Sequence, residues 1–386
     1  MLITDTYAAP GLRAFDSEEQ EVLRRIIDRQ CVYRGAGISE PRYAIAVEER
    51  LKKDFGAAYS LALNSGTSAL LIALEYLRLE PGDEIILPAY GWISLLSAIL
   101  YCRATPVICP VNEDLTLDPA ALADLMSTRT RAVILVHPCG NVGNRDAVLS
   151  LTAGTDIAVI EDACQCPYGL PCSPDTLCTF LSFQSFKVIT AGEGGALLTH
   201  RKAFYEHAVR FHDAGLDRFS QLPDKDEIPR GVGLNLRITE LQAGLLDRQM
   251  AKARTILHKL EIARDRYLEA LAGVLRGADS FTITNNDSNR NSSCILISAD
   301  STDTAAALNE TLNRAGVGSK IVGALPYHAA QGWMRYLDAN DFTYRTATAP
   351  AAYDNLQRLL LIEINWQRGD AFFSQLANVH LARGAG

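Results

Sequence analysis

The clearest indication of the fold is in residues 156–199, DIAVIEDACQCPYGLPCSPDTLCTFLSFQSFKVITAGEGGALLT. They contain three short apolar runs that we predict to be strands: DIAVIE (156–161), TFLSF (179–183) and GALLT (195–199). The runs are continuous rather than alternating, as expected for strands covered on both faces. Asp162 follows the first run directly, and Lys187 lies between the second and the third.

The same kind of run recurs towards the N-terminus, in EIILP (84–88), TPVICPV (105–111) and RAVILVH (131–137). Helical patterns lie between these runs, at about 92–102, 118–126 and 145–153. Alternation of strands and helices predicts an α/β fold with a mainly parallel sheet and right-handed crossovers.

The chain has 386 residues. This length exceeds one ordinary core and predicts a large domain followed by a smaller one. We place the large domain at residues 12–250 and a small C-terminal α+β domain at 251–386, joined by a charged connector helix at about 250–273. Thr239 and Gln242 form a capping-box pattern that predicts the start of a helix.

Charge and composition exclude several classes of protein. A net charge of −8 and a pI near 5.5 argue against a nucleic-acid-binding surface. The longest apolar run, Trp92–Cys102, is too short to span a bilayer, and the N-terminus lacks the features of a signal peptide. We therefore expect a cytoplasmic enzyme without membrane partners.

Nine cysteines, an odd number, favour reduced thiols over a disulfide framework. Four of them cluster at Cys164, Cys166, Cys172 and Cys178, with a spacing that matches no zinc or iron–sulfur pattern. We interpret them as small buried apolar residues or as bystanders in a loop, and we expect no metal site.

Candidate functional residues lie where predicted strands end, because open α/β sheets bind ligands at the carboxyl ends of their strands. SGTS (65–68) opens a predicted helix whose free N–H groups could hold a phosphate; a helix cap without a ligand is an equally good interpretation. Asp162, at a buried strand end, needs a partner for its charge, such as a protonated pyridine nitrogen. A carboxylate that caps the next helix is the alternative.

Lys187 is flanked by apolar Phe186 and Val188. Such surroundings disfavour the charged amine, and a neutral amine can form an imine with an aldehyde. A lysine that reaches the surface is the alternative, but GEGG (192–195) permits a close approach to a ligand. Trp92 could stack on a flat ring or belong to the core. Phosphate cradle, aromatic, acid and lysine together match a pyridoxal 5'-phosphate site.

With these motifs the sequence resembles the DegT/DnrJ/EryC1/StrS family of fold-type-I pyridoxal-phosphate enzymes, from about residue 35 to 255. The strongest matches are LNSGTSALLIAL (63–74), PGDEIILPAYGWIS (81–94), ATPV (104–107), VIEDACQ (159–165), SFQSFKVITAGEGGALLT (182–199) and NLRITELQAGL (235–245). The resemblance implies a large domain with a mainly parallel seven-stranded-type sheet, pyridoxal 5'-phosphate as cofactor, and aminotransferase activity in amino-sugar or antibiotic biosynthesis.

Four residues would hold the cofactor's phosphate, if the family's roles are carried over position by position. Gly66 and Thr67 would bind it through the backbone and the hydroxyl, and Ser182 would add a contact. Asn235 would reach the phosphate bound to the partner subunit. This last role implies a homodimer with shared active sites.

Four further residues would act on the cofactor's ring and aldehyde. The resemblance implies that Trp92 stacks on the pyridine ring and that Asp162 pairs with the ring nitrogen. Gln165 would hydrogen-bond the phenolic oxygen. Lys187 would hold the aldehyde as a Schiff base and later carry the proton.

The implied reaction moves an amino group from glutamate or glutamine to a keto sugar, keto cyclitol or related keto compound. The sequence departs from the family pattern at His137-Pro-Cys-Gly140, at Cys166–Gly169 and at 172–180, which puts the acceptor in doubt. We expect the segments Thr6–Phe15, Val32–Gly37 and Lys320–His328 to contact the acceptor.

Several other functions compete with this one. One is a pyridoxal-phosphate enzyme that catalyses dehydration or elimination, although the family's dehydratases have histidine where this chain has Lys187. Another is a non-catalytic binding or regulatory protein that keeps the fold. A nicotinamide enzyme is disfavoured because no G-x-G-x-x-G opens a helix.

Overall fold

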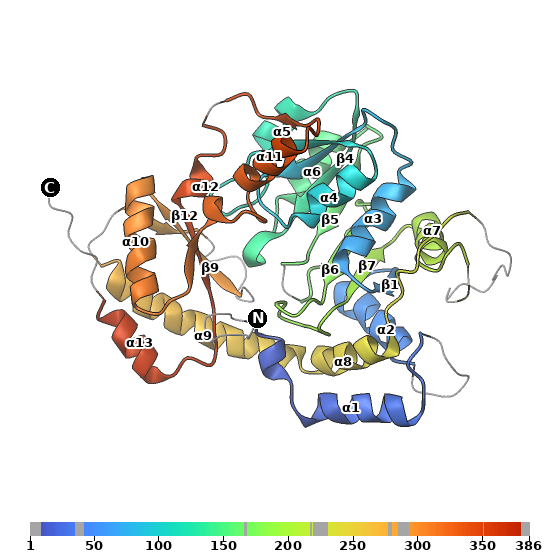
Figure 1. Ribbon diagram of the computed structural model, residues 1–386, viewed down its shortest axis with the longest axis horizontal. Coiled ribbons are helices and arrows are strands. Elements are labelled where there is room, and N and C mark those ends of the chain that lie inside the picture. The colour runs from blue at the N-terminus through green and yellow to red at the C-terminus, as the bar shows by residue number, and fades with distance from the viewer. Residues whose placement is uncertain are drawn as a thin grey trace.

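This computed structural model describes residues 9–34, 42–165, 168–216, 218, 231–276, 280–284, 293–349 and 351–379. The larger of its two sheets has eight strands in the order β1-β7-β6-β5-β4-β2-β3-β11 (Figure 1). The strands are β1 (Tyr59–Leu63), β2 (Glu84–Pro88), β3 (Thr105–Cys109), β4 (Thr130–Val136), β5 (Ala158–Asp162), β6 (Cys178–Ser182), β7 (Gly195–Thr199) and β11 (Arg345–Thr346). Only the pairs β1–β7 and β6–β7 are antiparallel, which confirms the predicted mainly parallel sheet.

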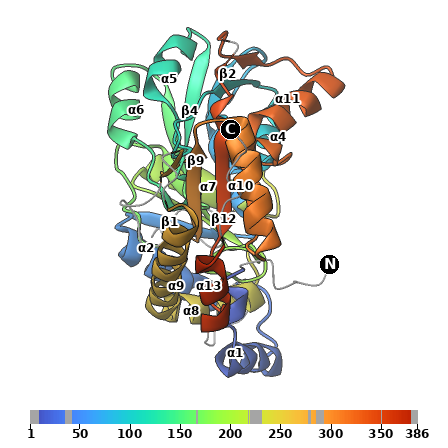
Figure 2. The ribbon, with the colours of Figure 1, turned by 90° about the vertical axis from the view of Figure 1, so that its left-hand side faces the viewer.

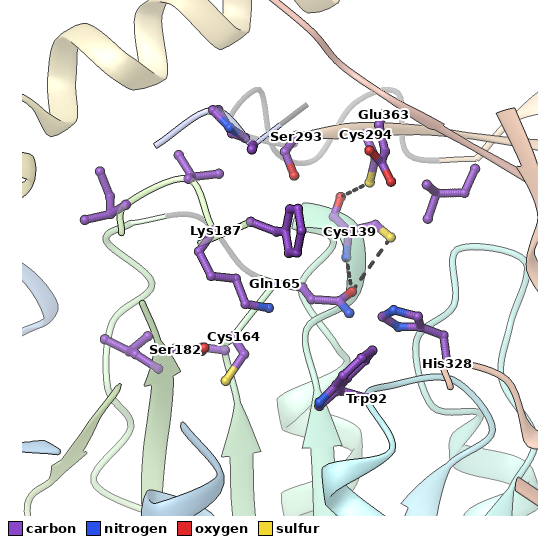
Figure 3. A pocket seen from close by; sticks show the side chains of 18 of the residues that line it. Trp92, Cys139, Cys164, Gln165, Ser182, Lys187, Ser293, Cys294, His328 and Glu363 are labelled. Carbon is purple, nitrogen blue, oxygen red and sulfur yellow. Dashed lines mark hydrogen bonds between the residues drawn. The ribbon is translucent and has the colours of Figure 1, made fainter. Parts of the chain in front are cut away.

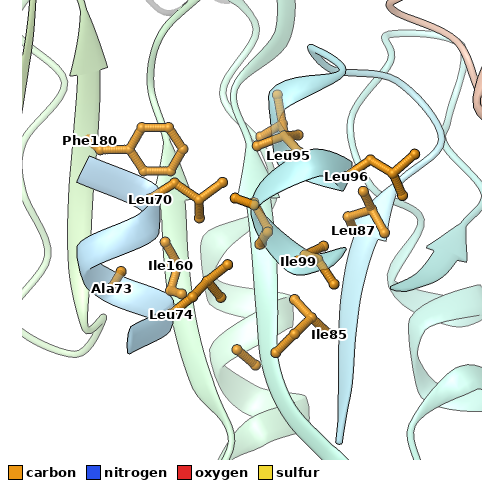
Figure 4. Close-up of a cluster of buried hydrophobic side chains, with 14 of the residues drawn as sticks. Leu70, Ala73, Leu74, Ile85, Leu87, Leu95, Leu96, Ile99, Ile160 and Phe180 are labelled. Atoms are coloured by element: carbon orange, nitrogen blue, oxygen red, sulfur yellow. The ribbon is translucent and has the colours of Figure 1, made fainter. Parts of the chain in front are cut away.

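Helices cover both faces of this sheet, as the continuous apolar strands predicted. On β2, Ile85 and Leu87 pack with Leu70 of α3 (Gly66–Tyr76) and Ile99 of α4 (Ser94–Tyr101) (Figure 4). Ile86, between them, points to the opposite face, because successive side chains of a strand alternate. There it packs with apolar residues of α5 (Pro119–Leu125) and α6 (Arg145–Thr152).

The predicted connector at about 250–273 corresponds to a single helix, α9 (Ala253–Val274), which is preceded by a separate helix, α8 (Glu240–Ala251). The capping box at Thr239 and Gln242 begins α8, and α9 follows after Lys252. The capping prediction is therefore confirmed. The two helices run along one side of the molecule and lead away from the large sheet (Figures 1 and 2).

The second sheet is antiparallel, in the order β10-β12-β9-β8. Its strands are β8 (Phe281–Ile283), β9 (Cys294–Ala299), β10 (Ser319–Ile321) and β12 (Leu359–Glu363). Apolar residues of α9 (Leu260, Leu271) and of α10 (Leu308) pack with Ile297 and Leu360 to form a separate core. The remaining elements are α1 (Ser17–Asp28), α2 (Tyr43–Phe55), α7 (Lys202–His212), α10 (Thr302–Arg314), α11 (Ala330–Ala339), α12 (Asn355–Arg358), α13 (Asp370–Ala377), η1 (Leu12–Ala14), η2 (Pro138–Gly140) and η3 (Val322–Ala324).

The C-terminal part of the chain also returns to the large sheet. Strand β11 pairs with β3 in parallel and adds an eighth strand to the predicted seven. The Tyr353 hydroxyl donates to the Ile108 carbonyl at 2.8 Å. The two sheets are thus joined by α9 and by this returning segment, and the division at 12–250 and 251–386 stays a prediction. None of the helices in the described part of the chain has the length and apolar character needed to cross a membrane.

Candidate active site

A pocket of about 450 Å³ lies where β5 and β6 of the large sheet end and the small sheet begins (Figure 3). This volume is in the range of ligand-binding cavities. The large-sheet side contributes Tyr90, Trp92, Cys139, Ala163, Cys164, Gln165, Leu181, Ser182 and Lys187, and the small-sheet side contributes Ser293, Cys294, Lys320, Leu361 and Glu363.

The loop between β6 and β7 holds Lys187 in a defined position. The Lys187 N–H donates to the Gln184 carbonyl at 2.8 Å, and the Gly11 N–H donates to the Lys187 carbonyl at 3.2 Å. The Thr190 hydroxyl donates to the Phe183 carbonyl at 2.9 Å, which closes the loop on itself. The Lys187 amine points into the pocket, towards Gln165 and Cys164 (Figure 3).

Asp162 is the last residue of β5 and is 5% exposed. Its Oδ1 accepts the Cys164 N–H at 2.9 Å. Burial raises the pKa of Asp162, and the bond from Cys164 and the nearby charge of Lys187 only partly offset this. A buried acid of this kind is stabilised by a cation, so the site suits a ligand with a positively charged ring atom.

The N-terminus of α3 approaches the pocket closely. Ser65 caps the helix by accepting the Ser68 N–H at 3.1 Å. A Cβ atom on Gly66 would lie 3.1 Å from Cys164 Sγ and 3.2 Å from Ser182 Cβ, so the start of α3 is beside two pocket residues. The first turn of a helix leaves backbone N–H groups free, and such groups can hold an anion. Ser182 lines the pocket beside this turn, and Thr67, in the turn, is exposed.

Aromatic residues form the side of the pocket near α4. The Trp92 ring lies 4.9 Å from the His328 ring and 6.2 Å from the Tyr327 ring, centre to centre. Burial, together with the charges of Lys187 and Lys320, lowers the pKa of His328 from 6.5 to about 4. His328 is therefore neutral at pH 7, and the Trp92 face has a neutral aromatic neighbour.

Gln165 is fixed by η2, the turn that follows β4. Its Oε1 accepts the Cys139 N–H at 3.3 Å, and its backbone carbonyl accepts the Gly140 N–H at 3.1 Å. Cys139 has φ 52°, a conformation that a non-glycine residue adopts at a cost. The HPCG segment thus orients Gln165, in addition to lining the pocket through Cys139.

Asn235 lies apart from the pocket. It is exposed and forms an isolated antiparallel bridge with Asp213. Within this one chain it does not join the other predicted residues, and its predicted role towards the partner subunit stays a prediction.

Two of the three segments expected to contact the acceptor contribute to the pocket. Ala9 and Pro10 line it, and so do Lys320 and the residues 325–328. In the third segment, residues 32–34 do not line it, and Gly35–Gly37 lie outside the described residues, as does Thr6–Ala8.

Sequence reasoning missed several pocket residues. Cys164 lies in the pocket, although we read the cysteine cluster as bystanders; Cys166 lies outside the described residues. Cys139, Cys294 and Glu363 also line the pocket. The available signal for Glu363 was an acid at the end of the apolar run LLLIE (359–363). Nothing in the local sequence marked Cys294.

Comparison with known proteins identifies the family. The DegT/DnrJ/EryC1/StrS aminotransferase family matches residues 14–365. The L-glutamine:2-deoxy-scyllo-inosose aminotransferase of Streptomyces lividus is 32% identical over 254 residues, 63% of this chain and 58% of that protein. The 3-amino-5-hydroxybenzoate synthase of Amycolatopsis mediterranei is 31% identical, over 63% of this chain and 62% of that protein.

These alignments span about three fifths of the length of each relative. The fold matches a solved aminotransferase from Psychrobacter cryohalolentis with a TM-score of 0.80 at 19% identity, over 95% of this chain and 96% of that one. The chain therefore belongs to the DegT/DnrJ/EryC1/StrS aminotransferase family of fold-type-I, pyridoxal-phosphate-dependent enzymes.

Proposed function

We propose that this chain binds pyridoxal 5'-phosphate and transfers an amino group from glutamate or glutamine to a keto sugar, keto cyclitol or related keto compound. The observation that carries the proposal is that the Lys187 amine points into a pocket whose lining residues Ala163 and Cys164 directly follow the buried acid Asp162, which does not itself line the pocket. A surface lysine or a helix-capping acid would not require this arrangement.

The first turn of α3 and Ser182 would hold the cofactor's phosphate. Gly66 and Thr67 offer backbone N–H groups, and the helix dipole favours negative charge there. The close approach of Gly195 to Ser65, where a Cβ atom would lie 2.2 Å from the Ser65 carbonyl carbon, supports this role, because it holds the start of α3 against the end of β6.

Three further residues would orient the cofactor's ring. Asp162 would pair with the ring nitrogen and keep it protonated, which offsets the cost of burying the acid. Trp92 would cover one face of the ring, and Gln165, held by the Cys139 N–H, would bond the phenolic oxygen. When bound, the cofactor supplies a reactive aldehyde and a ring that accommodates the electron pair released at the substrate carbon.

Lys187 would then act as the base and acid of the reaction. Once released from the cofactor, its amine can take a proton from the donor's carbon and return it at another atom. The loop bonds at Lys187 N, Thr190 and Gly11 restrict where the amine can reach. The nearby apolar side chains of Phe183 and Ile189, which also line the pocket, help to exclude water.

We also propose that two chains assemble around shared sites. Asn235 lies on an exposed segment with Val232, which is 88% exposed, and Leu234, which is 37% exposed. A polar residue flanked by exposed apolar residues suits an interface in which Asn235 reaches the partner's phosphate cradle. An Asn235→Ala dimer that bound the cofactor as tightly as the wild type would contradict this role.

The proposal is tested by Lys187→Ala, with Lys202→Ala as the control. Lys202 lies at the start of α7, is largely exposed and belongs to no part of the pocket. The wild type and the control should absorb visible light after incubation with pyridoxal 5'-phosphate, and borohydride should fix the cofactor on the Lys187 peptide. Lys187→Ala should lose both signals, and transamination should fall by about 10²–10⁴-fold. Full turnover by Lys187→Ala, or a wild type that takes up no cofactor, would refute the proposal.

A further inference from the structure

One face of the small sheet forms a wall of the pocket. Lys320 on β10 is registered opposite Leu361 of β12, and Glu363 lies two residues further along the same strand. Lys320, Leu361 and Glu363 all line the pocket, together with Cys294, the β9 partner of Glu363. The alternate residues Leu360 and Ile362 point to the other face and pack in the small core.

This wall carries an ion pair. The Lys320 ammonium lies 2.6 Å from a Glu363 carboxylate oxygen, and the two side chains are 40% and 26% exposed. Among the described residues that line the pocket, Lys320 and Glu363 are the charged side chains other than Lys187, since His328 is neutral at pH 7. A pair that stays accessible to water is held weakly, so a ligand can compete for either partner.

We propose that Lys320 binds the carboxylate of the amino donor, and that Glu363 makes the site prefer glutamine over glutamate. This inference rests on the proposed function and narrows the donor that it leaves open. It assigns both residues to donor recognition and leaves the cofactor to the residues of the large sheet.

The charges of the pocket favour the binding of one carboxylate group and disfavour the binding of a second. Lys320 lines the same pocket into which the Lys187 amine points, together with Trp92 and His328. A donor must present its α-carboxylate near the reacting carbon, and Lys320 is the cation, other than Lys187, among the described residues that line this pocket. Glutamate brings a second carboxylate, which would face Glu363 and be repelled. The side-chain amide of glutamine is neutral and can donate hydrogen bonds to Glu363.

The experiment follows the donor half-reaction alone, so that no acceptor is needed. The holoenzyme is mixed with L-glutamine or L-glutamate, and the loss of visible absorbance is recorded against donor concentration. We expect the wild type to react at lower concentrations of glutamine than of glutamate. Lys320→Ala should raise the half-saturating glutamine concentration about 10- to 100-fold, the cost of losing a charged hydrogen bond, with the starting spectrum unchanged. Lys320→Arg should recover most of this loss.

Glu363→Gln should improve the binding of glutamate, whereas Lys320→Ala weakens the binding of the donor. Removal of the negative charge should lower the half-saturating glutamate concentration about 10-fold and so narrow the preference for glutamine. Lys202→Ala and Glu206→Gln change an ion pair on α7, outside the pocket, in which Lys202 is exposed and Glu206 is half-buried. They serve as matched controls and should leave the half-saturating concentrations of both donors unchanged.

The outcomes separate the two proposals. If the wild type shows no cofactor absorbance or no reaction with either donor, the proposed function fails. If the wild type reacts but prefers glutamate, or if Lys320→Ala and Lys320→Arg both keep wild-type donor affinity, the role of the Lys320–Glu363 pair is wrong and the aminotransferase assignment stands.

Discussion

Substitution of Gly195 by alanine should displace the start of α3 and weaken cofactor binding. Gly195 begins β7 and is held on both sides, opposite Leu63 of β1 and Ser182 of β6. An added Cβ atom would lie 2.2 Å from the carbonyl carbon of Ser65 and 2.4 Å from the backbone nitrogen of Gly66. Because these are backbone atoms, no side-chain rotation can relieve the overlap.

The size of the effect follows from these distances. The added Cβ atom would lie more than 1 Å closer to the Ser65 carbonyl carbon than ordinary van der Waals contact allows. Either β7 or the first turn of α3 must therefore move. Overpacking of this kind costs about 1–3 kcal/mol of folding free energy. The N–H groups of Gly66 and Thr67 move with the turn, and misplacement by about 1 Å can weaken a positioned interaction by roughly 10²-fold.

The assay pairs urea unfolding of the apo-protein with titration by pyridoxal 5'-phosphate. Gly369→Ala is the matched control, because Gly369 has φ −85° and a Cβ atom there would meet nothing within 4 Å. We expect the control to resemble the wild type, while Gly195→Ala loses stability and binds the cofactor about 10- to 100-fold more weakly. If Gly195→Ala unfolds and binds like the control, the close approach of β7 and α3 has no role in the site.

Two further predictions concern buried histidines and the aromatic wall. Burial lowers the pKa of His212 to about 3 and that of His328 to about 4, below their usual 6.5. Below pH 6.5 the unfolded chain therefore binds more protons than the folded one, so the free energy of unfolding should be highest above pH 6.5 and should fall as the pH drops towards 3. Urea unfolding at several pH values measures this, and a free energy of unfolding that stays constant from pH 7 to 4 would contradict it. Trp92→Ala should weaken cofactor binding by about 10-fold in the same titration, and Trp92→Phe by much less, since aromatic stacking contributes about 0.5–1.5 kcal/mol beyond buried area. Equal losses in both variants would argue against stacking.

Much of the large sheet could be predicted because its strands carry their own apolar signal. EIILP and GALLT match β2 and β7 residue for residue. Strand β1 was missed, since YSLAL (59–63) contains small and polar residues and is fixed by antiparallel pairing with the distant β7. Strand β11 has two residues and no periodicity, so only its contact with β3 defines it.

The residues of the candidate site also divide into those that could be predicted from the sequence and those that could not. Asp162, Ser182 and Lys187 could be proposed from sequence because they stand at or just after strand ends, where the topology of an open sheet brings ligands. Glu363 and Cys294 could not, because they lie on the small sheet, which α9 and the returning C-terminal segment join to the large one. The positions of these two residues in the pocket depend on packing between parts of the chain that are far apart in sequence.

Two adjacent acids on β5 have opposite environments, and this contrast gives a final prediction. Alternation along the strand turns Glu161 to one face and Asp162 to the other. Burial would raise the pKa of Glu161, but hydrogen bonds and charges from His137, at 2.9 Å, and Arg145, at 2.6 Å, outweigh it and lower that pKa. The pKa of Asp162 is instead raised by burial. The negative charge of Glu161 is thus compensated by His137 and Arg145, whereas the environment of Asp162 suits the positive charge of a ligand.

Stability of the apo-protein should separate the two acids. Glu161→Gln removes the charged partner of the half-buried Arg145 and weakens the hydrogen bonds made at a fully buried position, and it should cost about 1–3 kcal/mol. Asp162→Asn keeps the acceptor for the Cys164 N–H and removes a buried charge, so it should be neutral or stabilising at pH 8. Because the folded-state pKa of Asp162 is raised, the cost of this acid to stability begins above its ordinary pKa of 3.8 and is complete above the folded-state pKa, so the difference between Asp162→Asn and wild type should vanish as the pH falls below 3.8. With cofactor bound the order should reverse, Asp162→Asn losing the stabilisation that the wild type gains. Asp162→Asn that destabilised the apo-protein as strongly as Glu161→Gln would show that Asp162 is a structural acid and not one kept for a ligand.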